Sequence, residues 1–226
     1  MLDAVPGIQY RFNQPGLLQQ ALTHRSVGPY NYERLEFLGD SILNLVVSTR
    51  LFERYPVAAE GDLSRMRARV VRGKTLGEIA ERLALGKHLI LGEGEMKSGG
   101  FRRSSILADA LEAVLGAIFL DGGYPACRDV IITLCDPLID SLPPAEALKD
   151  SKTRLQEWLQ ARGRPLPVYE LVREEGADHA KKFYVSCTLE DNGARVVGSG
   201  NSRRKAEQAA AAEVLAELPG TNAAAP

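Results

Sequence analysis

The chain has 226 residues, 45% of them apolar, which is enough for one large domain or two ordinary ones with buried cores. No run of about eighteen apolar residues occurs, so the sequence argues against a membrane-spanning helix. The formal net charge is −1: residues 1–149 carry 17 Lys and Arg against 18 Asp and Glu, and residues 150–226 carry 11 of each. Overall charge therefore does not predict a polyanionic partner, and any case for nucleic acid rests on where the charges lie.

The cysteines and the N-terminus predict a cytoplasmic protein. Cys127, Cys135 and Cys187 are odd in number and lack the spacing of metal ligands, so we expect reduced thiols. The N-terminal segment has neither the basic start nor the apolar stretch of a signal peptide. The three histidines are scattered, which argues against a zinc site built from histidine.

The first part of the chain is predicted to be all-α, because no alternating strand pattern occurs before about residue 165. Residues 32–52 form an apolar-rich helix, and the segment 60–85 forms two more helices that separate near Gly73.

A second long helix is predicted over residues 104–120, and its ends carry recognisable signals. Ser104 or Ser105 is expected to be its N-cap, and Asp121-Gly122-Gly123 is expected to stop it. Residues 124–140 then form another helix.

The composition changes at residues 141–150, where Pro143-Pro144 indicates a domain boundary. The predicted division is a helical domain at 1–147, a linker at 148–151, a second domain at 152–219 and a tail at 220–226.

The second domain is predicted to have the order α-β-β-β-α. Residues 152–162 are helical, and three strands follow, with the sequences VYELV, KFYVSCTL and ARVVGSG. In the middle strand Phe183, Val185, Cys187 and Leu189 alternate with Tyr184, Ser186 and Thr188. Asp191-Asn192-Gly193 predicts a hairpin turn, and Ser202 predicts the cap of an Ala-rich helix that ends near Pro219.

Two groups of carboxylates carry the chemistry of the helical domain. On a helix, Glu33, Glu36 and Asp40 lie within a wedge of roughly 60°. Asp109 and Glu112 form an i, i+3 pair in a helix that is otherwise almost wholly apolar and is therefore expected to be buried.

Buried, unpaired carboxylates are costly, and the cheapest resolution is for the two groups to face each other and share divalent cations. Oxygen ligands alone select Mg²⁺ or Mn²⁺, which are the usual ions of phosphoryl chemistry. The spacing alone leaves an alternative open, in which these acids form an ordinary solvated helix face.

The sequence resembles the bacterial ribonuclease III family over nearly its whole length. The resemblance rests on the signature YERLEFLGDS at 32–41, where the family usually has Asn in place of Tyr32, and on further matches. These are LTHRS at 22–26, EGDLS at 60–64, KSGGFRR at 97–103 and ILAD at 106–109.

The resemblance implies a metal-dependent endoribonuclease specific for double-stranded RNA. It implies metal ligands at Glu36, Asp40, Asp109 and Glu112, with Asp40 and Glu112 the residues most closely tied to catalysis. It further implies Mg²⁺ as cofactor with Mn²⁺ able to substitute, and hydrolysis to 5′-phosphate and 3′-hydroxyl ends with short 3′ overhangs. The expected substrates are ribosomal RNA precursors and some messenger RNAs.

Glu33 and Glu60 match two further acids near the cleavage site and the dimer seam, although a salt bridge to an arginine across the dimer is an equal alternative. We interpret His24 as structural, because acids already supply the chemistry. The basic run at Arg65, Arg67, Arg69, Arg72 and Lys74 fits either a solvated face or phosphate contact.

The second domain resembles the double-stranded-RNA-binding domain, which reads the shape of A-form RNA through phosphates and 2′-hydroxyls. The resemblance implies three contact regions. They are the helix bearing Gln156, the loop bearing His179, and the helix start at Arg203, Arg204 and Lys205. Glu207 stands where many members of that domain family outside this nuclease family carry a lysine.

The family resemblance also implies a homodimer, with residues 37–47 as the candidate seam or, alternatively, as ordinary core. No membrane and no small-molecule cofactor are expected. A non-catalytic double-stranded-RNA-binding regulator is the main alternative, and it would require the loss of one or more metal acids. A phosphohydrolase of the His-Asp type would require more histidine ligands than the chain offers.

Overall fold

The computed structural model describes residues 2–144, 148–177 and 180–218, which divide into two compact units at residues 145 and 146. Each unit has a core of its own and is described by itself. None of the helices in these described ranges combines the length and the apolar content that crossing a bilayer requires.

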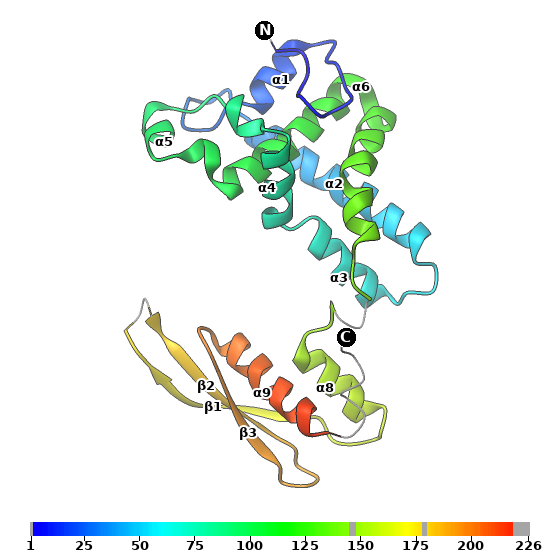
Figure 1. Cartoon of the computed structure of the whole chain (residues 1–226), viewed down its shortest axis with the longest axis vertical. Helices are drawn as coiled ribbons and strands as arrows, with labels where there is room; N and C mark the ends of the chain where they lie inside the picture. The colour runs from blue at the N-terminus through cyan, green and yellow to red at the C-terminus, as the bar shows by residue number, and fades with distance from the viewer. Residues whose placement is uncertain (1, 145–147, 178–179, 219–226) are drawn as a thin grey trace. The chain divides into compact units, whose positions relative to one another are not determined.

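The first unit is all-α, as predicted (Figure 1). Its helices are α1 (Pro15–Ala21), α2 (Glu33–Arg54), α3 (Glu60–Val70), α4 (Gly73–Arg82), α5 (Glu93–Lys97) and α6 (Ser104–Asp140), with short 3₁₀ turns at Leu85–Lys87 and Gly100–Arg102. Within the described part of this unit, β pairing is limited to two isolated bridges. The predicted break near Gly73 is confirmed.

The longest helix, α6, is kinked where the sequence predicted a stop. Gly123 has a φ of 76°, outside the helical region, and divides α6 into an earlier and a later half. The predicted cap at Ser104 or Ser105 is wrong: Arg103 is the N-cap, and no side chain accepts a capping hydrogen bond. Ser104 instead packs against α4, since a Cβ on Gly77 would lie 2.3 Å from the Ser104 Oγ.

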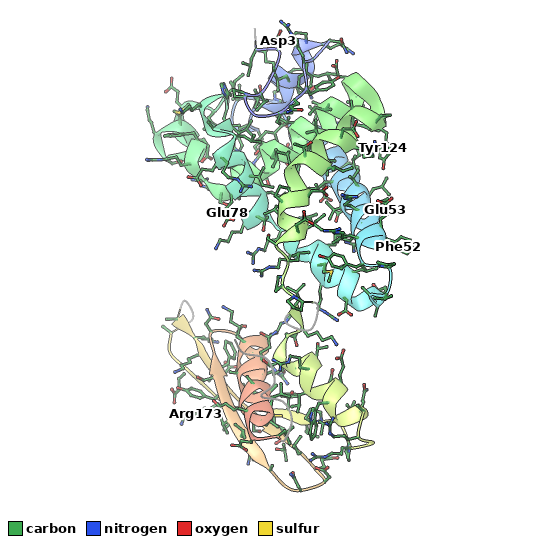
Figure 2. All side chains as sticks on the ribbon, turned by 45° about the vertical axis from the view of Figure 1, so that its right-hand side comes forward. Asp3, Phe52, Glu53, Glu78, Tyr124 and Arg173 are labelled. Atoms are coloured by element: carbon green, nitrogen blue, oxygen red, sulfur yellow. The ribbon has the colours of Figure 1, made fainter. Side chains whose placement is uncertain are left out.

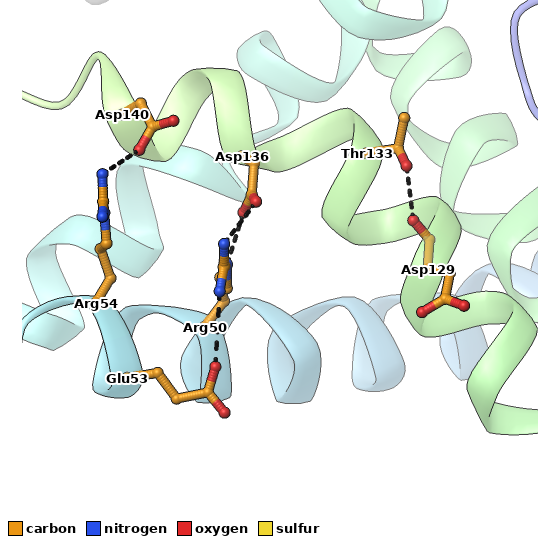
Figure 3. A network of polar contacts seen from close by, with 7 residues as sticks. All are labelled: Arg50, Glu53, Arg54, Asp129, Thr133, Asp136 and Asp140. Atoms are coloured by element: carbon orange, nitrogen blue, oxygen red, sulfur yellow. Dashed lines mark hydrogen bonds and ion pairs between the residues drawn. The ribbon is translucent and has the colours of Figure 1, made fainter.

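Helices α2 and α6 make the most extensive contact of the first unit. Towards their C-terminal ends they are joined by ion pairs (Figure 3): Arg50 lies 2.8 Å from Asp136, and Arg54 lies 3.0 Å from Asp140. Because Arg54 and Asp140 are both exposed, their ion pair contributes little to stability. The apolar face between the helices therefore contributes most of the free energy of their association.

The second unit has the predicted α-β-β-β-α order. Its elements are α8 (Ser151–Gln160), β1 (Val168–Glu175), β2 (Lys182–Thr188), β3 (Arg195–Gly200) and α9 (Arg203–Glu217). The strands form an antiparallel sheet in the order β1-β2-β3, and Figure 1 shows both helices on one face of it.

The local signals of this unit behave as the sequence predicted. The Ser202 hydroxyl accepts a hydrogen bond from the Lys205 backbone N–H at 3.3 Å and caps α9. Gly193 has a φ of 70° in the predicted turn. Cys187 of β2 belongs to the core under the helices, whereas Ser186 is on the opposite face and is also fully buried, with Arg195 donating to its hydroxyl at 3.4 Å.

Candidate active site and RNA-binding surface

The geometry of the acidic site follows from a glycine contact between α2 and α6. A Cβ added to Gly39 would lie 1.8 Å from the Glu112 carbonyl oxygen, and one added to Gly116 would lie 2.2 Å from the Leu35 carbonyl oxygen. Only glycine permits this approach of two helix backbones. The contact brings the acids on either side of Gly39 within reach of the acids that precede Gly116.

A cleft of about 520 Å³ opens beside this contact. It is lined by acids from both helices and by cations from two other segments. The polar and charged residues lining it are His24, Arg25, Tyr32, Glu33, Glu36, Asp40, Glu95, Arg103, Ser105, Asp109 and Glu112.

Three of the four predicted metal ligands meet in the cleft. Glu36, Asp109 and Glu112 each offer a carboxylate oxygen, and these oxygens lie within 4.8 Å of one another. Asp40 lines the same cleft but is outside this cluster. Its Oδ1 accepts a hydrogen bond at 2.8 Å from the side-chain amide of Asn44, one turn further along α2.

The three carboxyl groups of the cluster are partly buried and close to one another, and their pKa values are raised. Burial, and then the negative charges of Asp40, Glu36 and Asp109, raise the pKa of Glu112 to about 8. Burial also raises the pKa of Asp109, and burial with the neighbouring Asp109 charge raises that of Glu36. Oxygen donors that repel one another in this way suit a hard divalent cation.

His24 also lines the cleft, with its ring buried and edge-on to Tyr32. Its Nδ1 accepts a hydrogen bond from the Ser26 backbone N–H at 3.1 Å and lies 2.8 Å from the Ser26 hydroxyl. The hydroxyl in turn accepts from the Gly92 backbone N–H at 2.8 Å. These contacts tie the histidine into the surrounding loops, in keeping with a structural role.

The two accessory acids lie in different places. Glu33 lines the acidic cleft, 3.6 Å from Arg25. Glu60 begins α3 and accepts a hydrogen bond from Ser64 at 2.7 Å. It lines a separate, mainly apolar hollow with Ser48, Thr49, Leu51, Phe52, Leu63, Ser64 and Arg67.

The candidate dimer seam divides into core and surface. Ile42, Leu43, Val46 and Val47 are buried within the first unit. On the other side of α2, Phe37 is 77% exposed and Leu45 is 55% exposed, and Phe52, labelled in Figure 2, is 71% exposed beyond the predicted range.

The basic run after Glu60 is partly engaged within the chain. Arg65 pairs with Asp62 at 2.7 Å, Arg67 donates to the Ser48 hydroxyl at 3.1 Å, and Lys74 lies 3.9 Å from Glu78. The side chains of Arg69 and Arg72 are exposed.

In the second unit, the predicted cations occupy the first turn of α9. Arg203, Arg204 and Lys205 are all exposed and follow the Ser202 cap. Gln156 is half-buried on α8, which packs against α9. His179 lies outside the described residues.

Three acids of this unit, Glu174, Glu175 and Asp191, have cations as neighbours. Glu174 lies 3.7 Å from Lys181, and Asp191 pairs with Arg164. Glu175 lies 3.1 Å from Arg173, which is labelled on the sheet in Figure 2.

The sequence did not point to Arg25 and Arg103 as individual residues of the cleft, or to Asn44 as the hydrogen-bond partner of Asp40. Arg25 and Arg103 fall within the LTHRS and KSGGFRR matches, which was the available signal. Asn44 gave no signal beyond its i, i+4 spacing from Asp40.

Family models match both units. A ribonuclease-III-like model matches residues 14–138, and a double-stranded RNA binding motif matches residues 151–218.

Curated relatives match nearly the whole chain. Ribonuclease 3 of Alcanivorax borkumensis is 55% identical over 207 residues, which are 91% of each chain. Ribonuclease 3 of Thiobacillus denitrificans is 56% identical over 220 residues, covering 96% of this chain and 97% of the relative. A crystal structure of the nuclease domain of the Campylobacter jejuni enzyme aligns with a TM-score of 0.57 at 42% identity, covering 60% of this chain and 93% of that one.

Proposed function

This chain belongs to the ribonuclease III family and is an endoribonuclease of double-stranded RNA, and we propose how its own residues divide the work. Glu36, Asp40, Asp109 and Glu112 hold the divalent metal. Arg203, Arg204 and Lys205, with Gln156 and His179, bind the duplex. The single observation that carries the proposal is the cluster of three carboxylates at the contact between α2 and α6.

We propose Mg²⁺ as the resident ion, with Mn²⁺ able to substitute. The donor set supports this choice, because Glu36, Asp109 and Glu112 offer oxygen atoms only and their mutual repulsion favours a cation between them. The ion supplies activation of water for attack on phosphorus and stabilisation of charge on the leaving oxygen.

The protein's own contribution is a preorganised acidic cleft. The Gly39 and Gly116 contact fixes the spacing of the two helices, so the acids do not have to be gathered when the RNA arrives. Asp40 and Glu112 are the proposed catalytic residues. Hydrolysis would leave 5′-phosphate and 3′-hydroxyl ends.

The cations beside the acids suit the negatively charged backbone phosphates of the RNA. Arg25 and Arg103 line the same cleft, and Arg103 is held by Glu95 at 2.7 Å. Guanidinium groups beside the carboxylates can receive backbone phosphates, although Arg103 must then share its contact to Glu95.

We propose a homodimer formed through α2. One solved structure of the Campylobacter jejuni nuclease domain is described as showing flexibility in a region involved in dimer formation. In this chain the exposed Phe37, Leu45 and Phe52 supply an apolar surface on α2, and the hollow lined by Leu51 and Leu63 lies on the same helix and on α3. A twofold dimer would present two sites to the two antiparallel strands of a duplex and leave short 3′ overhangs.

The dimer mechanism has a direct test. A heterodimer of wild-type and Glu112→Gln protomers, isolated with two different tags, should nick one strand and leave the duplex unbroken on native gels. Complete double-strand breaks from the purified heterodimer would show that one site serves both strands.

The main alternative, a non-catalytic regulator, predicts the loss of a metal acid, and all four are present. The proposed biological setting is the processing of ribosomal RNA precursors and some messenger RNAs in the cytoplasm. The activity itself is tested by incubating the protein with a long RNA duplex, with and without Mg²⁺, beside single-stranded RNA and duplex DNA. Cleavage confined to duplex RNA with Mg²⁺ supports the proposal, and an inert but folded protein contradicts it.

A further inference from the structure

An acid lies within the cationic start of α9. Glu207 follows Arg203 by one helical turn, and its side chain is only 15% exposed, whereas that of Arg203 is 59% exposed. One carboxylate oxygen of Glu207 lies 2.8 Å from the Lys152 ammonium nitrogen, and the other lies 3.3 Å from the Arg203 Nε. A single carboxylate thus contacts two cations on two helices.

Lys152 is fixed by a second contact. Its ammonium lies 4.3 Å from the centre of the Tyr169 ring, so it is held between a carboxylate and an aromatic face. It occupies the first turn of α8, one turn before Gln156, which places it beside a proposed RNA contact. Its side chain is one-third exposed, so water still reaches it.

Carboxylates of the same unit therefore neutralise part of the positive charge that α8 and α9 present. Arg204 also has a carboxylate nearby, since Asp150, the cap of α8, lies 3.9 Å away. An arginine that already donates to a carboxylate gains less from a phosphate than a solvated one, because the first contact must be given up or shared.

We propose that Glu207 limits the affinity of this domain for duplex RNA by neutralising Lys152 and holding Arg203 back from the RNA backbone. The inference rests on the proposed role of the α9 cations in RNA binding. Moderate affinity suits an enzyme that must release its cleaved duplex, because tight binding of substrate and product alike does not raise turnover.

A purely structural role for the same contacts makes a different prediction. If Glu207 and Lys152 only tie α8 to α9, losing either partner should loosen the domain and weaken binding. If Glu207 acts through charge, the two substitutions must have opposite effects. Removing the acid frees two cations, whereas removing Lys152 leaves the acid to neutralise Arg203 alone.

The test measures binding of the full-length protein to an RNA duplex of about 20 base pairs, longer than the ~16 that one such domain spans, without divalent metal so that no cleavage occurs. Glu207→Gln should bind roughly three to ten times more tightly, and the slope of log affinity against log salt should steepen by about one. Lys152→Met keeps the packing against Tyr169 and should bind more weakly. Glu213→Gln removes an exposed acid of the same helix and serves as the matched control, with affinity nearly unchanged.

Weaker or unchanged binding by Glu207→Gln, at an unchanged melting temperature, would overturn the inference. If Glu207→Gln does not fold, the double variant Glu207→Gln with Lys152→Met is measured in its place. The inference then requires the double variant to bind duplex RNA more tightly than Lys152→Met alone. Failure of the proposed function would look different, because Arg203→Ala with Arg204→Ala would then leave duplex binding intact.

Discussion

The two units of this protein arrange their acidic side chains differently: one gathers them together, and the other pairs them with cations. In the nuclease unit, Glu36, Asp109 and Glu112 are gathered in a partly buried cluster, where burial and repulsion raise their pKa values. In the RNA-binding unit, Glu174, Asp191 and Glu207 each lie against a cation of the same unit. The first arrangement favours an added cation, and the second tunes a surface for a polyanion.

The two arrangements differ in their effect on the stability of the folded protein. Like charges brought together in a low-dielectric cleft destabilise the empty site and are tolerated because a ligand relieves them. An exposed pair such as Glu174 with Lys181 contributes little to stability, so its charges can be adjusted for binding with small effect on the fold.

The largest expected effect comes from removing one charge from the acidic cluster. Glu112→Gln keeps the shape of the side chain and should lower Mg²⁺-dependent cleavage of a duplex by several orders of magnitude, with duplex binding retained. Gel assays of cleavage and of binding on the same preparation check both halves of this statement. Near-normal cleavage by the variant would show that Glu112 is not part of the active site.

A smaller effect is expected on the cationic surface of α9. Arg203→Ala with Arg204→Ala should weaken duplex binding about tenfold or more, and the slope of log affinity against log salt should flatten by roughly one to two, because fewer counterions are released. Titrations at several salt concentrations measure both quantities. Equal weakening at every salt concentration would indicate lost structure in place of lost phosphate contacts.

The helix contact that builds the cluster can be tested by adding one methyl group. In Gly39→Ala the new Cβ would meet the Glu112 carbonyl oxygen at 1.8 Å, so we expect a loss of about 1–3 kcal/mol in the free energy of unfolding. Gly16→Ala in α1 is the control, because nothing lies within 4 Å of its Cβ. Urea unfolding compares the two, and equal stability would show that the helices separate at no cost.

The smallest effect concerns pH. A carboxyl whose folded pKa is raised, as for Glu112 to about 8, favours the folded state while protonated and loses that advantage as pH rises from its unfolded value towards 8. The melting temperature of the metal-free protein should therefore fall between about pH 5 and pH 8. Glu112→Gln should reduce the fall, and identical pH profiles for the two proteins would contradict the raised pKa.

Much of the fold could be predicted from local signals. Periodicity predicted α2, α3 and α4, and the glycines at 122 and 123 predicted a stop at the place where α6 is kinked. The cap at Ser202 and the turn before β3 were equally plain. Short helices such as α1 and α5 were not predicted, since a few residues give no usable period.

The four metal acids and the facing of their two groups were predictable, whereas the cations of the cleft and the finer geometry were not. The acids of α2 and α6 could be named because carboxylates in apolar helices need an explanation. That Asp40 is held by Asn44, outside the cluster, depends on side-chain rotamers that no spacing reveals. The pairing of Lys152 with Glu207 joins positions 55 residues apart and follows only from the packing of α8 on α9.

We expect the acidic cluster to exchange protons for a divalent cation, because burial and the neighbouring acids raise the pKa of Glu112 to about 8. The most direct measurement is the proton release when Mg²⁺ is added to metal-free protein near pH 7 in weak buffer, with binding followed in the same titration. Wild-type protein should release close to one proton per site, whereas Glu112→Gln should release far less and bind Mg²⁺ more weakly. Mg²⁺ binding of equal strength in both proteins, with no difference in proton release, would show that the cluster does not work in this way.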